Sequence, residues 1–167
     1  NEQSFVIDFG SKIDLEINKN VNFFSEKILK NSKIIKELYI YNCVPSYNKI
    51  LIQFDPIISD KNKIISYIKS IKISQNIKTK TEKIIEVPIC YDDLYSLDLE
   101  EISKTIKLSK EDIINLHLST IFHVYMIGFL PGLPFMGNMN SILSLPRKIS
   151  PRIQVPKGSV GIVDKLC

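Results

Sequence analysis

The sequence has 167 residues, of which 44% are hydrophobic and 24% charged, and its formal net charge is +4. This is the ordinary composition of one folded, water-soluble domain or two small ones, and it excludes a disordered chain, a collagen and a disulfide scaffold. The basic charge comes mainly from lysines spread along the chain without interleaved aromatic residues, which argues against a nucleic-acid partner.

Residues 1–90 predict a small α/β domain. Its elements follow one another as strand 4–9, helix 21–31 capped by Asn18 or Asn20, strands 37–44 and 49–54 joined by the turn 45–48, helix 60–71 and strand 83–90. This β-α-β-β-α-β order is the split β-α-β arrangement. The plainest interpretation of this half is a structural or docking domain without chemistry of its own.

A second domain follows over residues 91–167. Asp98 is placed to cap a helix over 99–106, and Ser109 is placed to open a helix over about 110–125. Beyond this second helix the helical periodicity disappears.

The stretch 113–146 contains no Asp, Glu, Lys or Arg. A transmembrane helix needs about 20 mostly apolar residues, but glycines and prolines interrupt this stretch and weaken or end helices. We therefore expect burial, or contact with another chain, and no membrane partner.

The cysteines, Cys43, Cys90 and Cys167, form no CxxC or Cys/His pattern. An odd number without such spacing argues against a disulfide framework and against a zinc site. No signal peptide is recognisable, so we expect a reducing, cytoplasmic location.

Rare residue types are concentrated in residues 117–161, which hold both histidines, both arginines, five of the 6 glycines and five of the 8 prolines. The densest part is the loop 128–137, GFLPGLPFMG. Glycine permits positive φ and proline fixes φ, so such a loop can present backbone N–H groups to an anion or a carbonyl. It lacks the GxxxxGK[ST] pattern of a phosphate loop, and the alternative is a rigid loop that fills the core. The candidate binding residues are Gly128, Phe129, Pro131, Gly132, Pro134, Phe135 and Gly137.

Arg147 and Arg152 are the only arginines, and each follows a proline. The guanidinium fork binds carboxylate or phosphate through two hydrogen bonds and stays charged, which lysine does not reproduce. We interpret the pair as a two-arginine clamp for an anionic substrate or a nucleotide. The alternative is structural ion pairs, for example with Asp98 or Asp164.

Two further features hold candidate residues. His117 and His123 lie six residues apart on one predicted helix, so they do not align to chelate one metal ion. We expect one buried structural histidine, and His117 is the candidate for acid–base chemistry. Residues 155–163 predict a turn that leads into a strand, in which Gly158 and Ser159 can donate to a ligand oxygen.

These motifs resemble the KipI family, also called allophanate hydrolase subunit 1. The resemblance rests on His117, the run VYMIGFLPGLPFMG at 124–137, the two Pro-Arg pairs and VPKGSVGI at 155–162, with further matches in the first half. The sequence departs from the family at 133–135, where Leu-Pro-Phe replaces Phe-Pro-Tyr. It also lacks the tyrosine-proline stretch and Gly-Gly-Trp segment that follow in the family, so we expect it to be part of a longer protein.

The resemblance implies an α+β fold, with a small α/β domain over 1–90 and a carboxyltransferase-type, cyclophilin-like β-barrel that begins in 91–167 and is incomplete. It implies one subunit of an ATP-hydrolysing 5-oxoprolinase, which opens 5-oxoproline to glutamate with sister subunits of the A and C types. The chain alone would be inactive, and ATP, with Mg²⁺ as a possible companion, would bind to the assembled complex.

In that enzyme the arginines would supply positive charge, His117 would position groups or transfer a proton, and the loop 128–137 would shape the pocket. Two alternatives stay open. One is an inhibitor of a histidine kinase that docks through its apolar region. The other is a subunit of a biotin-linked carboxyltransferase that acts on urea, as in allophanate hydrolase.

Overall fold

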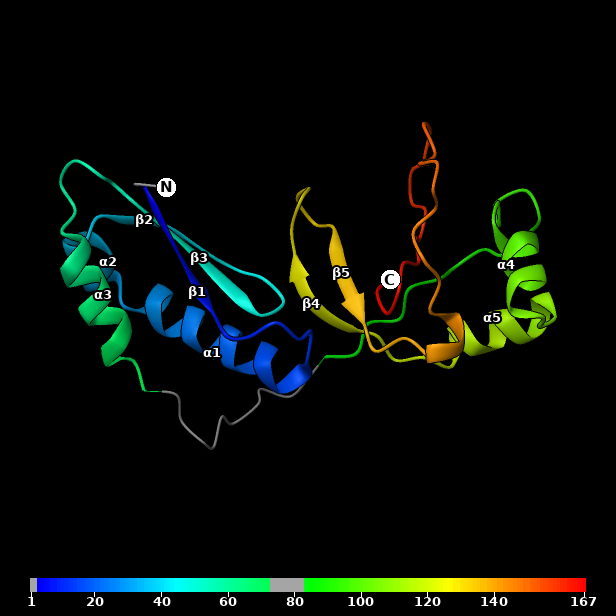
Figure 1. Cartoon of the computed structure of the whole chain (residues 1–167), viewed down its shortest axis with the longest axis horizontal. Helices are drawn as coiled ribbons and strands as arrows, with labels where there is room; N and C mark the ends of the chain where they lie inside the picture. Colours follow the sequence, from blue (N-terminus) through cyan, green and yellow to red (C-terminus); the bar gives the residue numbers. More distant parts are fainter. Residues whose placement is uncertain (1–2, 73–82) are drawn as a thin grey trace. The chain divides into compact units, whose positions relative to one another are not determined.

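The computed structural model describes residues 3–72 and 83–167. Contacts along the chain divide it into two compact units, residues 1–82 and 83–167 (Figure 1). The identities expected for the domains 1–90 and 91–167 stay predictions.

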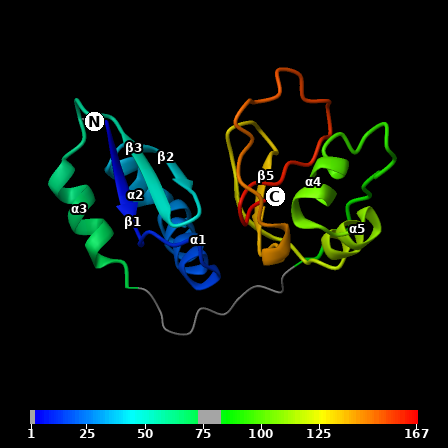
Figure 2. The same ribbon diagram turned by 45° about the vertical axis from the view of Figure 1, so that its right-hand side comes forward.

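The first unit contains a three-stranded antiparallel sheet in the order β1-β3-β2 (Figure 2). Its strands are β1 (Ser4–Asp8), β2 (Ile40–Pro45) and β3 (Lys49–Phe54). Because β3 is antiparallel to both neighbours, β1 and β2 run in the same direction on either side of it. This is the predicted split β-α-β arrangement with three strands.

Three helices accompany this sheet: α1 (Leu15–Lys30), α2 (Ser32–Glu37) and α3 (Lys61–Ser70). Every second residue of β3 is fully buried, as expected for a strand with one face in the core. The buried core joins the sheet to α1 and α3 and consists of Val21, Phe24, Ile28, Leu38, Ile40, Cys43, Ile50, Ile52, Phe54 and Ile64.

The start of α1 differs from the prediction. The helix begins at Leu15 because the Asp14 side chain accepts hydrogen bonds from the backbone N–H groups of Glu16 and Ile17, at 2.9 and 3.1 Å. The predicted cap Asn18 is instead buried inside the helix. Its amide donates to the carbonyls of residues 46 and 47 and holds the hairpin turn.

Two predicted strands of the first domain also need correction. The strand expected over 37–44 begins at Ile40, because α2 occupies the residues before it. The strand expected over 83–90 is absent: these residues have no regular structure, and Ile84 and Ile85 are each 70% exposed. Pro88 interrupts the run and removes a donor that a strand ladder needs.

The second unit contains two helices, a two-stranded antiparallel sheet and one 3-10 turn. They are α4 (Leu99–Ile106), α5 (Lys110–Leu118), β4 (His123–Ile127), β5 (Pro134–Gly137) and η1 (Ser141–Leu143). Its buried core is made of Leu99, Ile113, Met139 and Leu143. Two isolated bridges, Leu145–Asp164 and Val163–Leu166, lie outside these strands. The cyclophilin-like barrel stays a prediction.

The helix expected over 110–125 is shorter than predicted. Ser109 opens it as expected, because its hydroxyl accepts from the N–H of Asp112 at 3.1 Å. The helix ends at Leu118, and His123 begins a strand, so the two histidines do not share a helix. The run of β-branched and aromatic residues from 121 to 125 favours a strand. The strand expected after 155 is reduced to the bridges at Val163.

No helix in the described part of the chain has both the length and the apolar character needed to cross a membrane.

Candidate functional site

The glycine- and proline-rich loop is the tip of the β4–β5 hairpin. Phe129 has a φ of 62° and is 89% exposed, and Gly132 has a φ of 82°. Leu130 and Leu133 are also exposed. The interpretation that this loop fills the core is therefore wrong, because its tip presents apolar side chains to solvent.

Hydrogen bonds inside the tip hold its shape. The N–H of Gly128 donates to the Leu133 carbonyl at 3.1 Å, and the N–H of Leu133 donates to the Leu130 carbonyl at 3.2 Å. Among the described residues, the backbone N–H groups of Phe129 and Gly132 have no partner. They are the donors that the tip can still offer to a ligand.

The other candidate residues of the loop build the hairpin itself. Pro134 and Phe135 lie in β5 and pair with β4. A Cβ at Gly137 would lie 2.6 Å from the Tyr125 ring, so this position accepts only glycine without movement of the ring. Pro131 lies at the exposed tip between the two strands.

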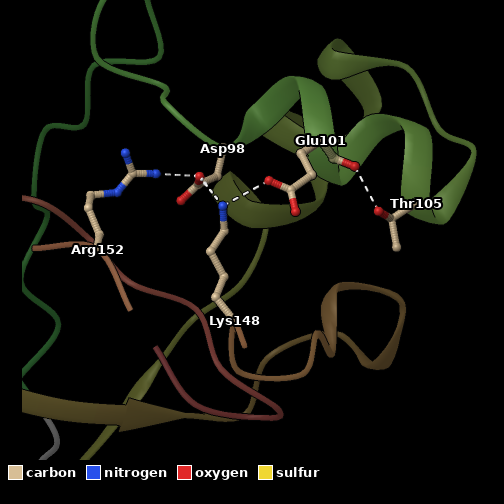
Figure 3. A network of polar contacts seen from close by, with 5 residues as sticks. All are labelled: Asp98, Glu101, Thr105, Lys148 and Arg152. Atoms are coloured by element: carbon tan, nitrogen blue, oxygen red, sulfur yellow. Dashed lines mark hydrogen bonds and ion pairs between the residues drawn. The ribbon is translucent and has the colours of Figure 1, made fainter. Parts of the chain in front are cut away.

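The basic segment, residues 147–152, is tied to the start of α4 (Figure 3). The Nη2 of Arg152 donates to Oδ1 of Asp98 at 2.5 Å, and Nζ of Lys148 donates to the same oxygen at 2.7 Å. Lys148 also reaches Oε2 of Glu101 at 2.8 Å. Arg152 therefore makes the ion pair with Asp98 that the sequence held as the alternative to a clamp.

The two arginines differ in their surroundings. Arg147 is exposed, and within residues 3–72 and 83–167 its side chain has no hydrogen-bond or ion-pair partner. Arg152 and Arg147 thus share no carboxylate of the described chain. The segment offers one uncommitted guanidinium next to two cations that are already paired.

Lys148 is a member of this network that the sequence did not single out. Its hydrogen bonds to Asp98 and Glu101 raise the pKa of its ammonium group, so it stays charged. The available signal was the acidic first turn of α4, where Glu100 and Glu101 follow Asp98. Nothing local in the sequence indicates which basic segment that turn attracts.

His117 lies in the buried part of the second unit. Its Nδ1 is 2.5 Å from the hydroxyl oxygen of Tyr91, and its Nε2 is 3.7 Å from the sulfur of Cys167. Burial lowers the pKa of His117 and raises the pKa values of Tyr91 and Cys167, so all three groups favour their neutral forms. No hydrogen bond or ion pair in the described residues joins His117 to either arginine.

The candidates near residue 158 form a tight turn. Gly158 has a φ of 83°, and the N–H of Ser159 donates to the Pro156 carbonyl at 3.2 Å. The Ser159 hydroxyl donates to the same carbonyl at 2.7 Å. Both donors of Ser159 are therefore engaged within the turn. No group of three or more His, Cys, Asp or Glu side chains in the described residues is arranged to hold a metal ion.

The family model for the carboxyltransferase domain, subdomain C and D, matches residues 1–167. The chain is 48% identical over 80 residues to the 5-oxoprolinase B subunit of Bacillus subtilis (strain 168), which is 48% of this chain and 33% of that protein. It is 26% identical over 161 residues to the 5-oxoprolinase B subunit of Haemophilus influenzae (strain ATCC 51907 / DSM 11121 / KW20 / Rd), which is 96% of this chain and 72% of that protein.

Among solved structures, the crystal structure of TTHA0988 is similar to this chain, with a TM-score of 0.81 and 27% sequence identity. The similarity covers 98% of this chain and 31% of TTHA0988. The matched region thus spans about a third of the Bacillus relative and of TTHA0988.

Proposed function

The chain belongs to the carboxyltransferase domain C and D family, and we propose that it is part of the B-type subunit of an ATP-dependent 5-oxoprolinase. This enzyme would open 5-oxoproline to glutamate together with A- and C-type sister subunits. The observation that carries the proposal is the sequence similarity to the proteins of two bacteria that are named as the B subunit of 5-oxoprolinase.

The chemistry of the reaction calls for positive charge. A lactam amide is stable, and phosphorylation of its carbonyl oxygen by ATP would make it open to attack by water. The reacting groups then carry phosphate and carboxylate charge, which preorganised cations stabilise. The exposed guanidinium of Arg147 fits this role, and Lys148 and Arg152 add positive charge beside it.

In this proposal His117 acts as a positioning residue, since both its ring nitrogens face groups of its own chain. The N–H groups of Phe129 and Gly132, which have no partner among the described residues, are backbone donors that the hairpin tip can offer to a substrate oxygen. The hairpin tip supports the expectation of a sister subunit, because large exposed apolar side chains gather there. A C-type subunit would cover it.

Assembly with the sister subunits tests the proposal. The protein that carries this sequence is mixed with A- and C-type subunits, and the mixture is separated by gel filtration. One peak that contains this protein and a sister subunit is the expected result.

A second arm addresses the alternatives. Separate peaks, together with inhibition of histidine-kinase autophosphorylation by the same preparation, would replace the proposal with the kinase inhibitor. Separate peaks and carboxylation of urea with a biotin-carrying partner would favour the carboxyltransferase.

A further inference from the structure

Asp98 holds two cations through a single oxygen. Its Oδ1 accepts from Lys148 and Arg152, which follow it by 50 and 54 residues in the sequence (Figure 3). Three residues lie between the two cations. One carboxylate therefore fixes both halves of the basic segment at the start of α4.

Asp98 also lacks the local role that its position suggests. Aspartate before a helix normally accepts from the backbone N–H groups of the first turn. Asp14 and Asp60 do so in the first unit. Asp98 precedes α4 but has φ −113° and ψ −5° and makes no cap hydrogen bond. Its oxygen is used by the basic segment instead.

We propose that Asp98 is a positioning residue for the basic segment: it pairs with Lys148 and Arg152, fixes the segment, and leaves Arg147 as the cation offered to a polyphosphate anion. Glu101 supports this arrangement through Lys148. The anion class rests on the proposed function, because ATP is its polyphosphate substrate. The pairing of Asp98 with Lys148 and Arg152, called the tether below, rests only on the contacts of Asp98.

The structure explains why the pairing would matter for Arg147. Exposed long side chains and loops lose conformational freedom when they bind a ligand. The basic segment is already fixed at Lys148 and Arg152, so it loses less of that freedom when Arg147 binds a ligand. Asp98→Asn should therefore bind an anion at Arg147 more weakly than a variant that loses the same negative charge elsewhere on α4, although Asp98 does not touch the anion.

Trypsin reports on the tether directly, since it must take the Lys148 or Arg152 side chain into its own pocket to cleave after it. The variant Asp98→Asn keeps the shape and loses the charge, and Asp98→Glu restores the charge. Glu100→Gln is the matched control, because Glu100 lies on the same helix and, within the described residues, pairs only with Lys104 and Lys110. Mass spectrometry measures the initial cleavage rate at each bond.

Cleavage after Lys148 and Arg152 should be about three- to tenfold faster in Asp98→Asn than in the wild type. This range corresponds to the loss of two exposed ion pairs. Asp98→Glu and Glu100→Gln should cleave at rates near wild type. Equal cleavage of Asp98→Asn and wild type would overturn the tether.

Inorganic tripolyphosphate then probes the anion site at constant ionic strength. It should slow cleavage after Arg147 in the wild type. Asp98→Asn should need about three times more of it or higher for the same protection than Glu100→Gln, which loses the same negative charge from the same helix. A merely structural role would leave the protecting concentration unchanged in the folded variant, and that result overturns the inference. If tripolyphosphate does not slow cleavage after Arg147 in the wild type, the inference is also overturned.

These readouts need no catalytic turnover, so the two proposals can fail separately. If the assembled complex has no 5-oxoprolinase activity while the cleavage and protection results are as expected, the proposed function is wrong and the positioning role of Asp98 stands. If the complex is active and Asp98→Asn behaves as wild type in both assays, only the positioning role is wrong.

Discussion

The hydroxyl oxygen of Tyr91 lies 2.5 Å from Nδ1 of His117, a ring that is 26 residues further along the chain. The two side chains join the segment that opens the second unit to helix α5. The Phe122 ring packs against the same imidazole, with centroids 5.2 Å apart. His117 is 6% exposed, and this burial lowers its pKa and so favours the neutral ring.

The stability of the second unit should therefore depend on pH through His117. Burial lowers its pKa from 6.5 in the folded protein, so the unfolded chain binds the proton first as the pH falls. The full contribution is present above pH 6.5 and is lost as the pH falls from there toward the folded pKa. Urea unfolding at pH 7.5, 6.5 and 5.5 measures this decrease.

The variant His117→Gln should lose that part of the pH dependence, and His123→Gln, at the start of β4, should keep it. Equal pH slopes in wild type and His117→Gln would contradict the neutral, buried state of this ring.

The cysteines should differ strongly in reactivity. Cys43 is buried, and its burial raises the thiol pKa from 9.0 to about 11, whereas Cys90 is exposed. The raised pKa keeps the Cys43 thiol protonated at pH 8, so little of the reactive thiolate is present. Labelling with a disulfide reagent, followed by peptide mass analysis, should show Cys90 modified early and Cys43 late. In about 6 M guanidinium, which unfolds most domains, the two cysteines should react at similar rates. Equal labelling rates in the folded protein would contradict the buried state of the Cys43 thiol.

The stability of the first unit should depend on the buried face of β3. Ile52 is fully buried at the centre of the sheet, so Ile52→Ala leaves a cavity and should cost about 2–5 kcal/mol of unfolding free energy. Ile57 is 90% exposed, and Ile57→Ala should change that free energy by less than about 0.5 kcal/mol. Thermal and urea unfolding of both variants measure the contrast. Similar losses of unfolding free energy in the two variants would contradict the placement of Ile52 in the buried core.

Arg147→Lys tests the uncommitted guanidinium. Lysine keeps the charge and loses the fork, so the assembled enzyme should lose about 1–3 kcal/mol of transition-state stabilisation, measured as kcat/KM. The melting temperature should not change, because Arg147 is exposed and has no partner among the described residues. Lys157→Arg, on another exposed part of the second unit, is the control. A lower melting temperature with normal specific activity would show that Arg147 is structural.

Local patterns predicted the elements whose signals lie within a few residues. The helix over 61–70 has apolar residues at helical spacing, and the hairpin of β2 and β3 has two apolar runs around a turn. The cap at Ser109 needs only its own first turn. These features depend on short-range hydrogen bonds, which sequence order determines directly.

The failures have long-range causes. The strand expected over 83–90 needed a partner ladder, and alternation alone does not show whether one is present. The partners of His117 lie 26 and 50 residues away, so spacing does not identify them. The pair between Arg152 and Asp98 spans 54 residues, and the sequence named Asp98 only as one of two acidic partners in the alternative to a clamp. Arg147 and Arg152 looked equivalent because both follow proline. Only the fold shows that Arg152 pairs with Asp98 while Arg147 has no partner in the part of the chain that the structure describes.

The central claim is that this chain is part of the B-type subunit of an ATP-dependent 5-oxoprolinase. The most direct measurement follows glutamate and ADP together, with 5-oxoproline and MgATP supplied to A- and C-type subunits in the presence or absence of this protein. The account predicts that both products form in equal amounts only when all three proteins are present. Product formation that does not depend on this protein, or none from the complete assembled complex, would contradict it.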